Sequence, residues 1–90
     1  MKSHPKFDEY LVLNEYRNDN GNLHREDGPA AVWRDGSAQW WIDGKRHRLD
    51  GPAVVQVNGI NYWYLDGDSL NESEFNNHPL VIMNRFVNGT

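Results

Sequence analysis

Short apolar runs alternate with glycine-containing turns through the middle of the chain. Each turn is an Asp-Gly or Asn-Gly pair, and it is flanked on both sides by residues with high β-propensity. Both central residues of a type I′ turn take positive φ, which these pairs tolerate, so the pattern predicts β-hairpins with two-residue turns. The first hairpin comprises residues 29–33, Asp35-Gly36 and 38–42, and the second comprises 52–55, Asn58-Gly59 and 60–65.

The two hairpins belong to a tandem repeat of 23 residues, His24 to Arg46 and His47 to Ser69. Each copy opens with His-Arg-x-Asp-Gly-Pro-Ala, and the copies also share Val32/Val55, Gly36/Gly59, Trp40/Trp63 and Asp43-Gly44/Asp66-Gly67. A fixed period of this kind marks units that stack to share one core. The remainder of each copy, with its second Asp-Gly turn, is expected to connect one hairpin to the next.

The N-terminal segment resembles an incomplete copy. Residues 1–9 are polar and are expected to be loosely ordered, whereas Tyr10 to Arg17 alternates well enough to predict a strand. A turn at Asn18 to Asn22 follows, and its Gly21 precedes Gly44 by one repeat length. Residues 10–23 therefore add a strand, which gives a mainly β fold of about five to six strands in tandem antiparallel hairpins.

Residues 70–90 have a different pattern, which predicts a short helical cap. Asp68 or Ser69 can cap a first helix in which Glu72 and Glu74 occupy the first turn and Phe75 supplies the apolar contact. Pro79 suits the start of a second helix, although β-branched residues leave a terminal strand open for 79–87. Its apolar residues are dense enough to be buried: Leu80, Val81, Ile82, Met83 and Phe86.

Two-residue hairpin turns would make both faces of the sheet apolar. One face would carry Ala31, Trp33, Ala38, Trp40, Ile42, Val54, Gln56, Asn61, Trp63 and Leu65; the other would carry Ala30, Val32, Arg34, Ser37, Gln39, Trp41, Ala53, Val55, Val57, Ile60, Tyr62 and Tyr64. In a sheet with one solvent-exposed face, apolar and polar residues alternate more regularly along each strand. We therefore expect both faces of this sheet to be covered. We expect Trp40 and Trp63 to be core beneath the cap.

Aromatic residues on the second face are the candidates for partner binding. The alternatives for these residues are a second small core, a contact in a homodimer and a surface that binds another protein. The last two rest on the rule that contiguous exposed aromatic patches mark interaction sites. The candidate partner-binding residues are Gln39, Trp41, Arg46, Arg48, Tyr62 and Tyr64.

Composition narrows the classes of function. The 90 residues make a single domain, too small for a large enclosed cavity, and the absence of cysteine excludes disulfides and thiolate metal sites. A net charge of −4 does not suggest the basic surface that binds nucleic acid. No apolar run suits a signal peptide or a membrane span, so we expect a cytoplasmic protein without a membrane role.

Catalytic and metal-site hypotheses find little support. His24 with Asp27, and His47 with Asp50, supply two ligands each, whereas zinc needs three or four. A turn in which Asp accepts hydrogen bonds from backbone or Arg explains them more simply. The serines lack a nearby His and carboxylate, and Glu72 and Glu74 suit a helix dipole. We expect no enzyme activity, no cofactor and no metal.

The repeat resembles a family of small proteins related to variant MORN repeats, found in tailed bacteriophages and some bacteria. The resemblance is carried by the two His-Arg-x-Asp-Gly-Pro-Ala copies, the opening Leu-Val-Leu-Asn-Glu-Tyr-Arg and the segment Leu70 to Phe75, and it covers roughly residues 10 to 76. It implies consecutive hairpins in an elongated sheet and a small accessory protein. The Tyr-x-Gly opening of MORN repeats is missing, so their lipid-binding role does not carry over.

These observations favour a non-enzymatic binding module, phage-encoded, that binds and modulates or inhibits a host protein, such as an antiviral defence protein, in the host cytoplasm. The alternatives are a structural or assembly protein of a virion, and a nucleotide-sequestering protein that uses the basic connector Arg46-His47-Arg48. A metal-dependent hydrolase using His24 and His47 is a distant third class.

Overall fold

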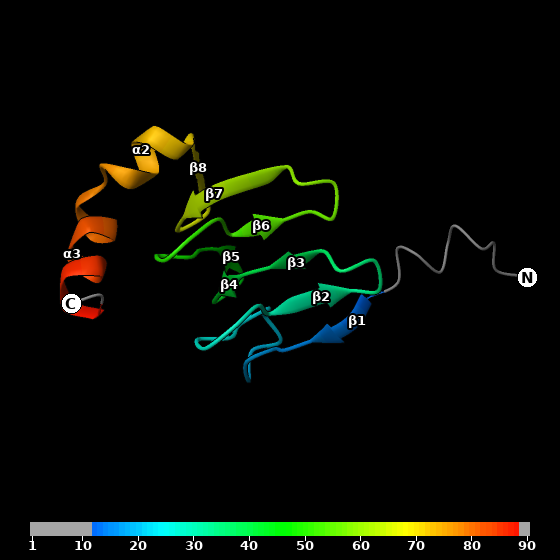
Figure 1. The fold of residues 1–90 in the computed structure, drawn as a ribbon. Coiled ribbons are helices and arrows are strands. Elements are labelled where there is room, and N and C mark those ends of the chain that lie inside the picture. The colour runs from blue at the N-terminus through cyan, green and yellow to red at the C-terminus, as the bar shows by residue number, and fades with distance from the viewer. Residues whose placement is uncertain (1–11, 89–90) are drawn as a thin grey trace, which may run out of the picture.

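The computed structural model describes residues 12–88 and shows a mainly β fold with two C-terminal helices (Figure 1). Six strands form an antiparallel sheet in the order β1-β2-β3-β6-β7-β8, and β4 pairs with β5 in a separate ladder. The strands are β1 (Val12–Glu15), β2 (Ala31–Trp33), β3 (Ala38–Gln39), β4 (Trp41–Ile42), β5 (Lys45–Arg46), β6 (Val54–Val55), β7 (Asn61–Leu65) and β8 (Asp68–Leu70), and the helices are α2 (Glu72–Asn76) and α3 (Pro79–Asn88). The predicted fold class, mainly β with a short helical cap, is confirmed.

The sheet runs continuously from one repeat into the next. Strand β3 of the first copy pairs with β6 of the second, with Gln39 opposite Val54. The amide of Trp40 donates to the carbonyl of Ala53 at 2.8 Å, and the amide of Tyr16 donates to Ala30 in the same way. Ala30 and Ala53 are fully buried, which explains why the signature ends in a side chain no larger than a methyl group.

Strand β1 accounts for the part of the predicted N-terminal strand that lies within the described residues. It covers Val12–Glu15 and pairs with β2, while Tyr10 and the loose segment 1–9 lie outside the described part of the chain. The turn predicted at Asn18 to Asn22 is present. There the Asn18 Oδ1 accepts the amides of Asn20 and Asn22, and Gly21 has a φ of 85°.

The hairpin turns at Gly36 and Gly59 differ from the prediction. Trp33 and Ser37 form the closing backbone bond, so the loop has three residues, and only its last residue, Gly36, has positive φ. The second hairpin repeats this arrangement, with Gln56 bonded to Ile60 and with Gly59 at a φ of 90°. These are type I turns followed by a left-handed glycine, which is the usual three-residue hairpin connection. The prediction of type I′ turns at these two sites was wrong.

The tight two-residue turns lie instead at the last Asp-Gly pair of each copy. Asp43 and Gly44 have φ values of 50° and 81°, and they join Ile42 to its partner Lys45. Asp66 and Gly67, at 51° and 86°, join β7 to β8 in the same way. These four residues have the positive φ values that a type I′ turn requires.

The extra loop residue shifts each hairpin by one position, which corrects the predicted faces. Ala31 lies opposite Gln39 rather than opposite Trp40, and Val54 lies opposite Tyr62. One face therefore carries Ala31, Trp33, Gln39, Val54 and Tyr62, and the other carries Val32, Ala38, Val55 and Asn61. By strand alternation, Trp63 and Leu65 share the second face with Asn61.

The core lies at the C-terminal end of the sheet, where the helices cover this second face. Leu65, Phe75 and Val81 are buried together, and Leu49, Trp63 and Leu70 pack against them. The rings of Trp63 and Phe75 lie 6.5 Å apart between centroids. Trp63 is thus core beneath the cap, as predicted. Trp40 is not part of this cluster, and that half of the prediction was wrong.

Helix α2 is capped by Asn71, not by Asp68 or Ser69. The Asn71 side chain accepts the amide of Glu74 at 2.7 Å, and the Glu74 carboxylate accepts the amide of Asn71 at 2.8 Å, which is a capping box. Asp68 and Ser69 are instead paired in β8. Glu72 and Glu74 occupy the first turn, as predicted.

Residues 79–88 form a helix, which decides between the two predicted alternatives. Pro79 is its first residue, and His78 precedes it with its Nδ1 accepting the amide of Leu80 at 3.1 Å. Of its apolar residues only Val81 is buried, whereas Ile82, Met83 and Phe86 are 51%, 61% and 73% exposed. The expectation that this apolar segment is buried was wrong.

Candidate binding surface

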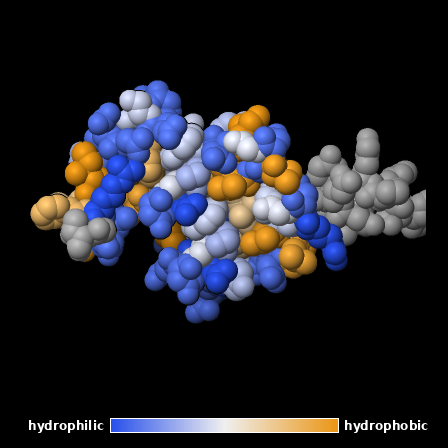
Figure 2. Space-filling model, viewed as in Figure 1, coloured by the Kyte–Doolittle hydropathy of each residue, from blue (hydrophilic) through white to orange (hydrophobic). Residues whose placement is uncertain are grey.

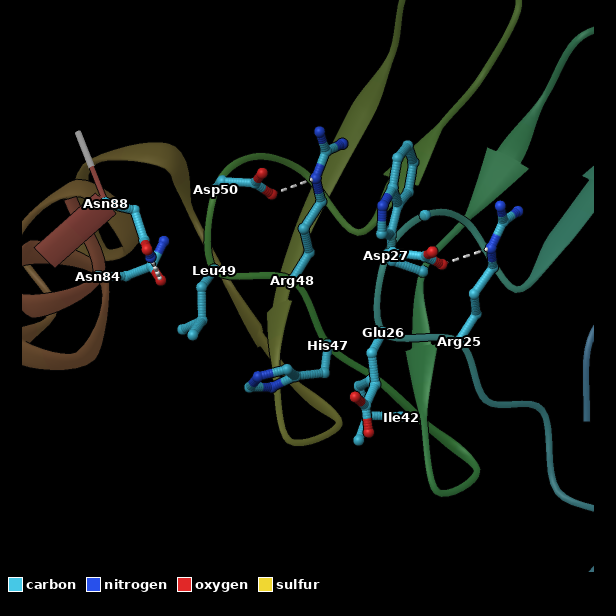
Figure 3. Close-up of a pocket in the computed structure, with 12 residues that line it drawn as sticks. Arg25, Glu26, Asp27, Ile42, His47, Arg48, Leu49, Asp50, Asn84 and Asn88 are labelled. Carbon is cyan, nitrogen blue, oxygen red and sulfur yellow. Dashed lines mark hydrogen bonds and ion pairs between the residues drawn. The ribbon is translucent and has the colours of Figure 1, made fainter. Parts of the chain in front are cut away.

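The Arg of each repeated signature is used to build the turn that follows it (Figure 3). Arg48 donates from Nε to the Asp50 carboxylate at 2.8 Å and from Nη1 to the Pro52 carbonyl at 3.0 Å. Its guanidinium lies 3.7 Å from the centroid of the Trp40 ring, in cation–π geometry. A Cβ at position 51 would come within 3.0 Å of the Arg48 Cζ, so the signature glycine leaves room for this packing.

The first copy makes the same set of contacts. Arg25 donates to Asp27 at 3.0 Å and to Pro29 at 3.3 Å, and it lies 4.2 Å from the centroid of the Tyr16 ring. Asp27 and Asp50 therefore accept from arginine, as the turn interpretation predicts. Each guanidinium stacks on an aromatic ring of the preceding segment, so the signature connects neighbouring units.

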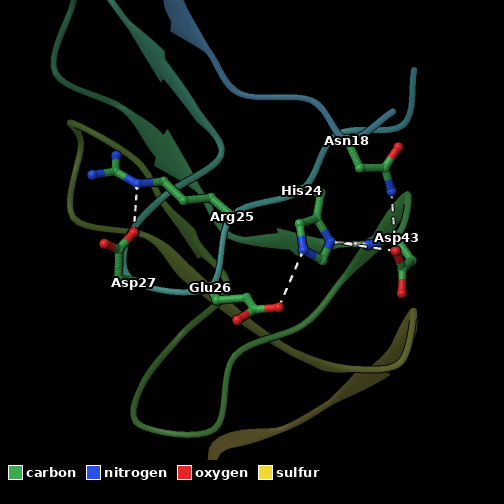
Figure 4. Close-up of polar contacts among 6 residues, drawn as sticks. All are labelled: Asn18, His24, Arg25, Glu26, Asp27 and Asp43. Atoms are coloured by element: carbon green, nitrogen blue, oxygen red, sulfur yellow. Dashed lines mark hydrogen bonds and ion pairs between the residues drawn. The ribbon is translucent and has the colours of Figure 1, made fainter. Parts of the chain in front are cut away.

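The signature histidines close the end of their own copies, and Figure 4 shows this contact for His24. The Nδ1 of His24 accepts the amide of Asp43 at 3.0 Å, and the Nδ1 of His47 accepts the amide of Asp66 at 3.0 Å. Because Nδ1 is the acceptor, the neutral ring carries its proton on Nε2. In His24 this nitrogen faces the Glu26 carboxylate at 3.4 Å.

The structure separates the residue pairs that the sequence offered as metal ligands. His24 contacts Glu26 and Asp43, whereas Asp27 binds Arg25. Within residues 12–88, no three side chains of His, Cys, Asp or Glu converge in a way that suits a metal ion. The repeated residue types are thus accounted for by turn and strand contacts.

We expect His47→Leu to lower the free energy of unfolding by about 1 kcal/mol, because the amide of Asp66 loses its acceptor. His47→Asn should recover most of this loss, since the Asn Oδ1 can accept the same bond. Urea unfolding monitored by circular dichroism gives both values. Equal losses in the two variants would show that ring packing, and not the Nδ1 acceptor, is what position 47 contributes.

Four of the six candidate partner-binding residues lie in one contact group, the Arg46 cluster, which consists of Gln39, Trp41, Arg46 and Tyr64. The Arg46 guanidinium lies 4.9 Å from the Trp41 ring centroid and 5.3 Å from that of Tyr64. The Gln39 Oε1 accepts from the Trp41 Nε1 at 3.0 Å and from the Arg46 Nε at 3.4 Å. Two rings and an amide therefore hold one guanidinium in place.

The other two candidates lie in different surroundings. Tyr62 is opposite Val54, which is opposite Gln39, so it shares the sheet face of the Arg46 cluster, and it is 44% exposed. The Arg48 side chain is engaged with Trp40, Asp50 and Pro52 and does not join the cluster, although the Arg48 amide donates to the Tyr64 carbonyl at 3.3 Å. The sequence could not separate Arg46 from Arg48, because both follow the same turn by a few residues.

A groove of about 740 Å³ separates the two signature loops from α3 (Figure 3). Its walls include Glu26, Asn84 and Asn88, which no pattern in the sequence had marked as site residues. The Asn88 side chain donates to that of Asn84 at 2.7 Å, and the arginines and aspartates of the groove bind each other. Part of this lining therefore pairs its polar groups internally. No sequence signal indicated it, because it depends on how α3 packs.

Comparisons with protein-family models, curated proteins and solved structures gave no match. In the described part of the chain, neither helix is long and apolar enough to cross a membrane.

Proposed function

We propose that this protein is a non-enzymatic binding module that contacts a target protein through the Arg46 cluster and Tyr62. The observation that supports this most is the arrangement of Arg46 between the Trp41 and Tyr64 rings. Tryptophan, tyrosine and arginine are the residues that most often dominate the energy of protein interfaces. Here they stand together on one sheet face beside an exposed tyrosine.

The chemistry of Arg46 indicates what the target presents. Its Nε is directed to Gln39, and its Nη atoms donate to no side chain or carbonyl of the described residues. A guanidinium oriented by flanking rings loses little freedom on binding and fits a carboxylate in bidentate geometry. The target surface therefore carries an Asp or Glu flanked by apolar side chains that cover the rings.

The proposed biological setting follows from the resemblance to phage repeat proteins. In this proposal the chain is a small phage-encoded accessory protein that binds a host protein, such as a component of antiviral defence, and modulates or inhibits it. The alternative of nucleotide sequestration by the basic connector is less favoured, because His47 and Arg48 are already committed to intramolecular bonds.

The test begins with capture of a host protein by the tagged chain and its identification by mass spectrometry. The affinity of that protein is then measured by calorimetry for the wild type, Arg46→Ala and Tyr64→Ala. We expect each variant to stay folded and to bind at least about tenfold more weakly, as truncation at an interface centre does.

Val57→Ala is the matched control, because Val57 is an exposed apolar residue at the tip of the β6–β7 hairpin, away from the Arg46 cluster. Its affinity should equal that of the wild type. Unchanged affinity in both Arg46→Ala and Tyr64→Ala would show that the target binds elsewhere on the molecule.

A further inference from the structure

Two exposed turns of the protein contain the pair Asn-Gly, which favours spontaneous deamidation, because a glycine leaves the next amide nitrogen open to the asparagine side chain. The pairs are Asn20-Gly21, between β1 and β2, and Asn58-Gly59, between β6 and β7, and all four residues are exposed. The segment between β1 and β2 reaches the lower edge of the view in Figure 1, and Figure 2 shows hydrophilic residues along that edge. Both pairs are therefore open to water.

The two turns have the same backbone arrangement. Gly21 and Gly59 have φ values of 85° and 90°, whereas neither asparagine has positive φ. Each glycine donates its amide to the carbonyl three residues earlier, at 2.9 Å in the first turn and at 3.0 Å in the second. A difference in reactivity between the two asparagines therefore depends on what holds their side chains.

The side chains of the two asparagines are held differently. The Asn58 Oδ1 accepts the amide of Ile60 at 2.9 Å, which fixes its carboxamide in the turn. In the other turn the corresponding amide, that of Asn22, donates instead to the Asn18 Oδ1 at 3.1 Å. The Asn20 side chain consequently makes no hydrogen bond with a group of residues 12–88, and it is free to rotate toward the following amide nitrogen.

We propose that Asn20 is a site of spontaneous deamidation and that it reacts before Asn58. The Gly21 amide nitrogen, once deprotonated, attacks the carbonyl carbon of the Asn20 side chain. The N–Cγ bond forms, the Cγ–Nδ2 bond breaks, and ammonia leaves with the proton that the Gly21 nitrogen gave up. Water then opens the resulting succinimide at either carbonyl and gives aspartate or isoaspartate. Water is the only co-reactant.

The isoaspartate product would weaken the contact between the N-terminal segment and the first repeat, because it adds a methylene to the backbone within this turn. The Gly21 carbonyl accepts from the Arg17 Nη1 at 2.7 Å. In the same turn, the Asn18 side chain donates to the Asp43 carboxylate at 3.0 Å and so joins the turn to the first repeat. Neither bond involves the Arg46 cluster, so the modification is independent of target binding.

The test follows both sites in one sample of the full chain, kept at neutral pH and physiological temperature. Trypsin cleaves after arginine and lysine, which places the two asparagines in separate peptides, 18–25 and 49–85. Mass spectrometry with fragmentation measures, at each asparagine, the mass gained when an amide becomes a carboxyl group. We expect Asn20 to react at least about fivefold faster than Asn58, the factor in rate that one hydrogen bond corresponds to. Two products of equal mass that separate by chromatography identify the succinimide route.

The same measurement in guanidinium chloride is the control for the fold. The two rates should then agree within about twofold, the spread that residual structure in an unfolded chain allows. Asn20→Gln is the matched control variant, because its longer side chain closes the ring less readily; position 20 should stay unmodified while Asn58 reacts at its usual rate. Equal rates in the folded chain, or a faster reaction at Asn58, would overturn the proposal. A difference that persists in denaturant would also overturn it, as would a folded chain in which both sites stay intact while the denatured sample reacts.

Discussion

Phe75→Ala is expected to lower the free energy of unfolding by about 3–5 kcal/mol, the usual cost of truncating a buried aromatic side chain. Phe75 is 1% exposed and lies between the sheet residue Leu65 and the α3 residue Val81. Helix α2 has only five residues, too few to be stable alone, so its position depends on this side chain. Its loss therefore loosens α2 and α3 together.

Chemical denaturation followed by tryptophan fluorescence measures this change, because the Trp63 ring lies 6.5 Å from that of Phe75. Phe75→Leu keeps most of the buried volume and should lose about 1.5 kcal/mol or less. Phe86→Ala, in the exposed position of α3, should lose about 1 kcal/mol or less. Similar losses at positions 75 and 86 would contradict the placement of the core.

The hairpins could be predicted from the sequence because apolar runs and glycine turns are local signals. The turn types could not, since Asp-Gly suits both a type I′ turn and the end of a three-residue loop. At Asp43-Gly44 both residues have positive φ, whereas at Asp35-Gly36 only the glycine does. The difference lies in the pairing of the flanking strands. Each of these three-residue loops has one residue more than predicted. The cross-strand neighbours of Gln39 and Tyr62 therefore differ from the predicted ones.

Of the candidate surface, the sequence identified the aromatic residues but not their arrangement. Trp41 and Tyr64 occupy equivalent positions in the two copies, and the stacking of the copies brings both rings to Arg46. The repeat alone does not reveal this arrangement, because the two rings come to the same guanidinium only after the sheet has formed.

The sequence predicted a helical cap, but it did not predict which apolar residues of the cap are buried. The apolar residues of α3 were expected to cover the sheet, but one turn of contact through Val81 is sufficient to dock the helix, because Phe75 already fills the space above Leu65 and Trp63. Amphipathic pattern shows which side of a helix is apolar, but it does not say whether that side faces the same chain or another one.

Arg48→Ala is expected to lower the free energy of unfolding by about 2–4 kcal/mol, because it removes a charge-assisted hydrogen bond to Asp50, a second bond to Pro52 and the stacking on Trp40. Arg48→Lys should lose most of the same energy, since an ammonium cannot make these contacts at once. Arg25→Ala should lose less, because its ring partner Tyr16 is 40% exposed and its bonds are longer.

A double-mutant cycle with Gly51→Ala separates these contacts from a general effect of charge. In the wild type the new methyl would stand 3.0 Å from the Arg48 Cζ and displace the guanidinium, whereas in the Arg48→Ala background the space is vacant. Gly51→Ala should therefore destabilise the wild type and be nearly neutral in that background. Additive losses, or an Arg48→Lys midpoint equal to that of the wild type, would mean that Arg48 is free for a partner. In that case the binding surface would extend from Arg46 into the groove beside α3.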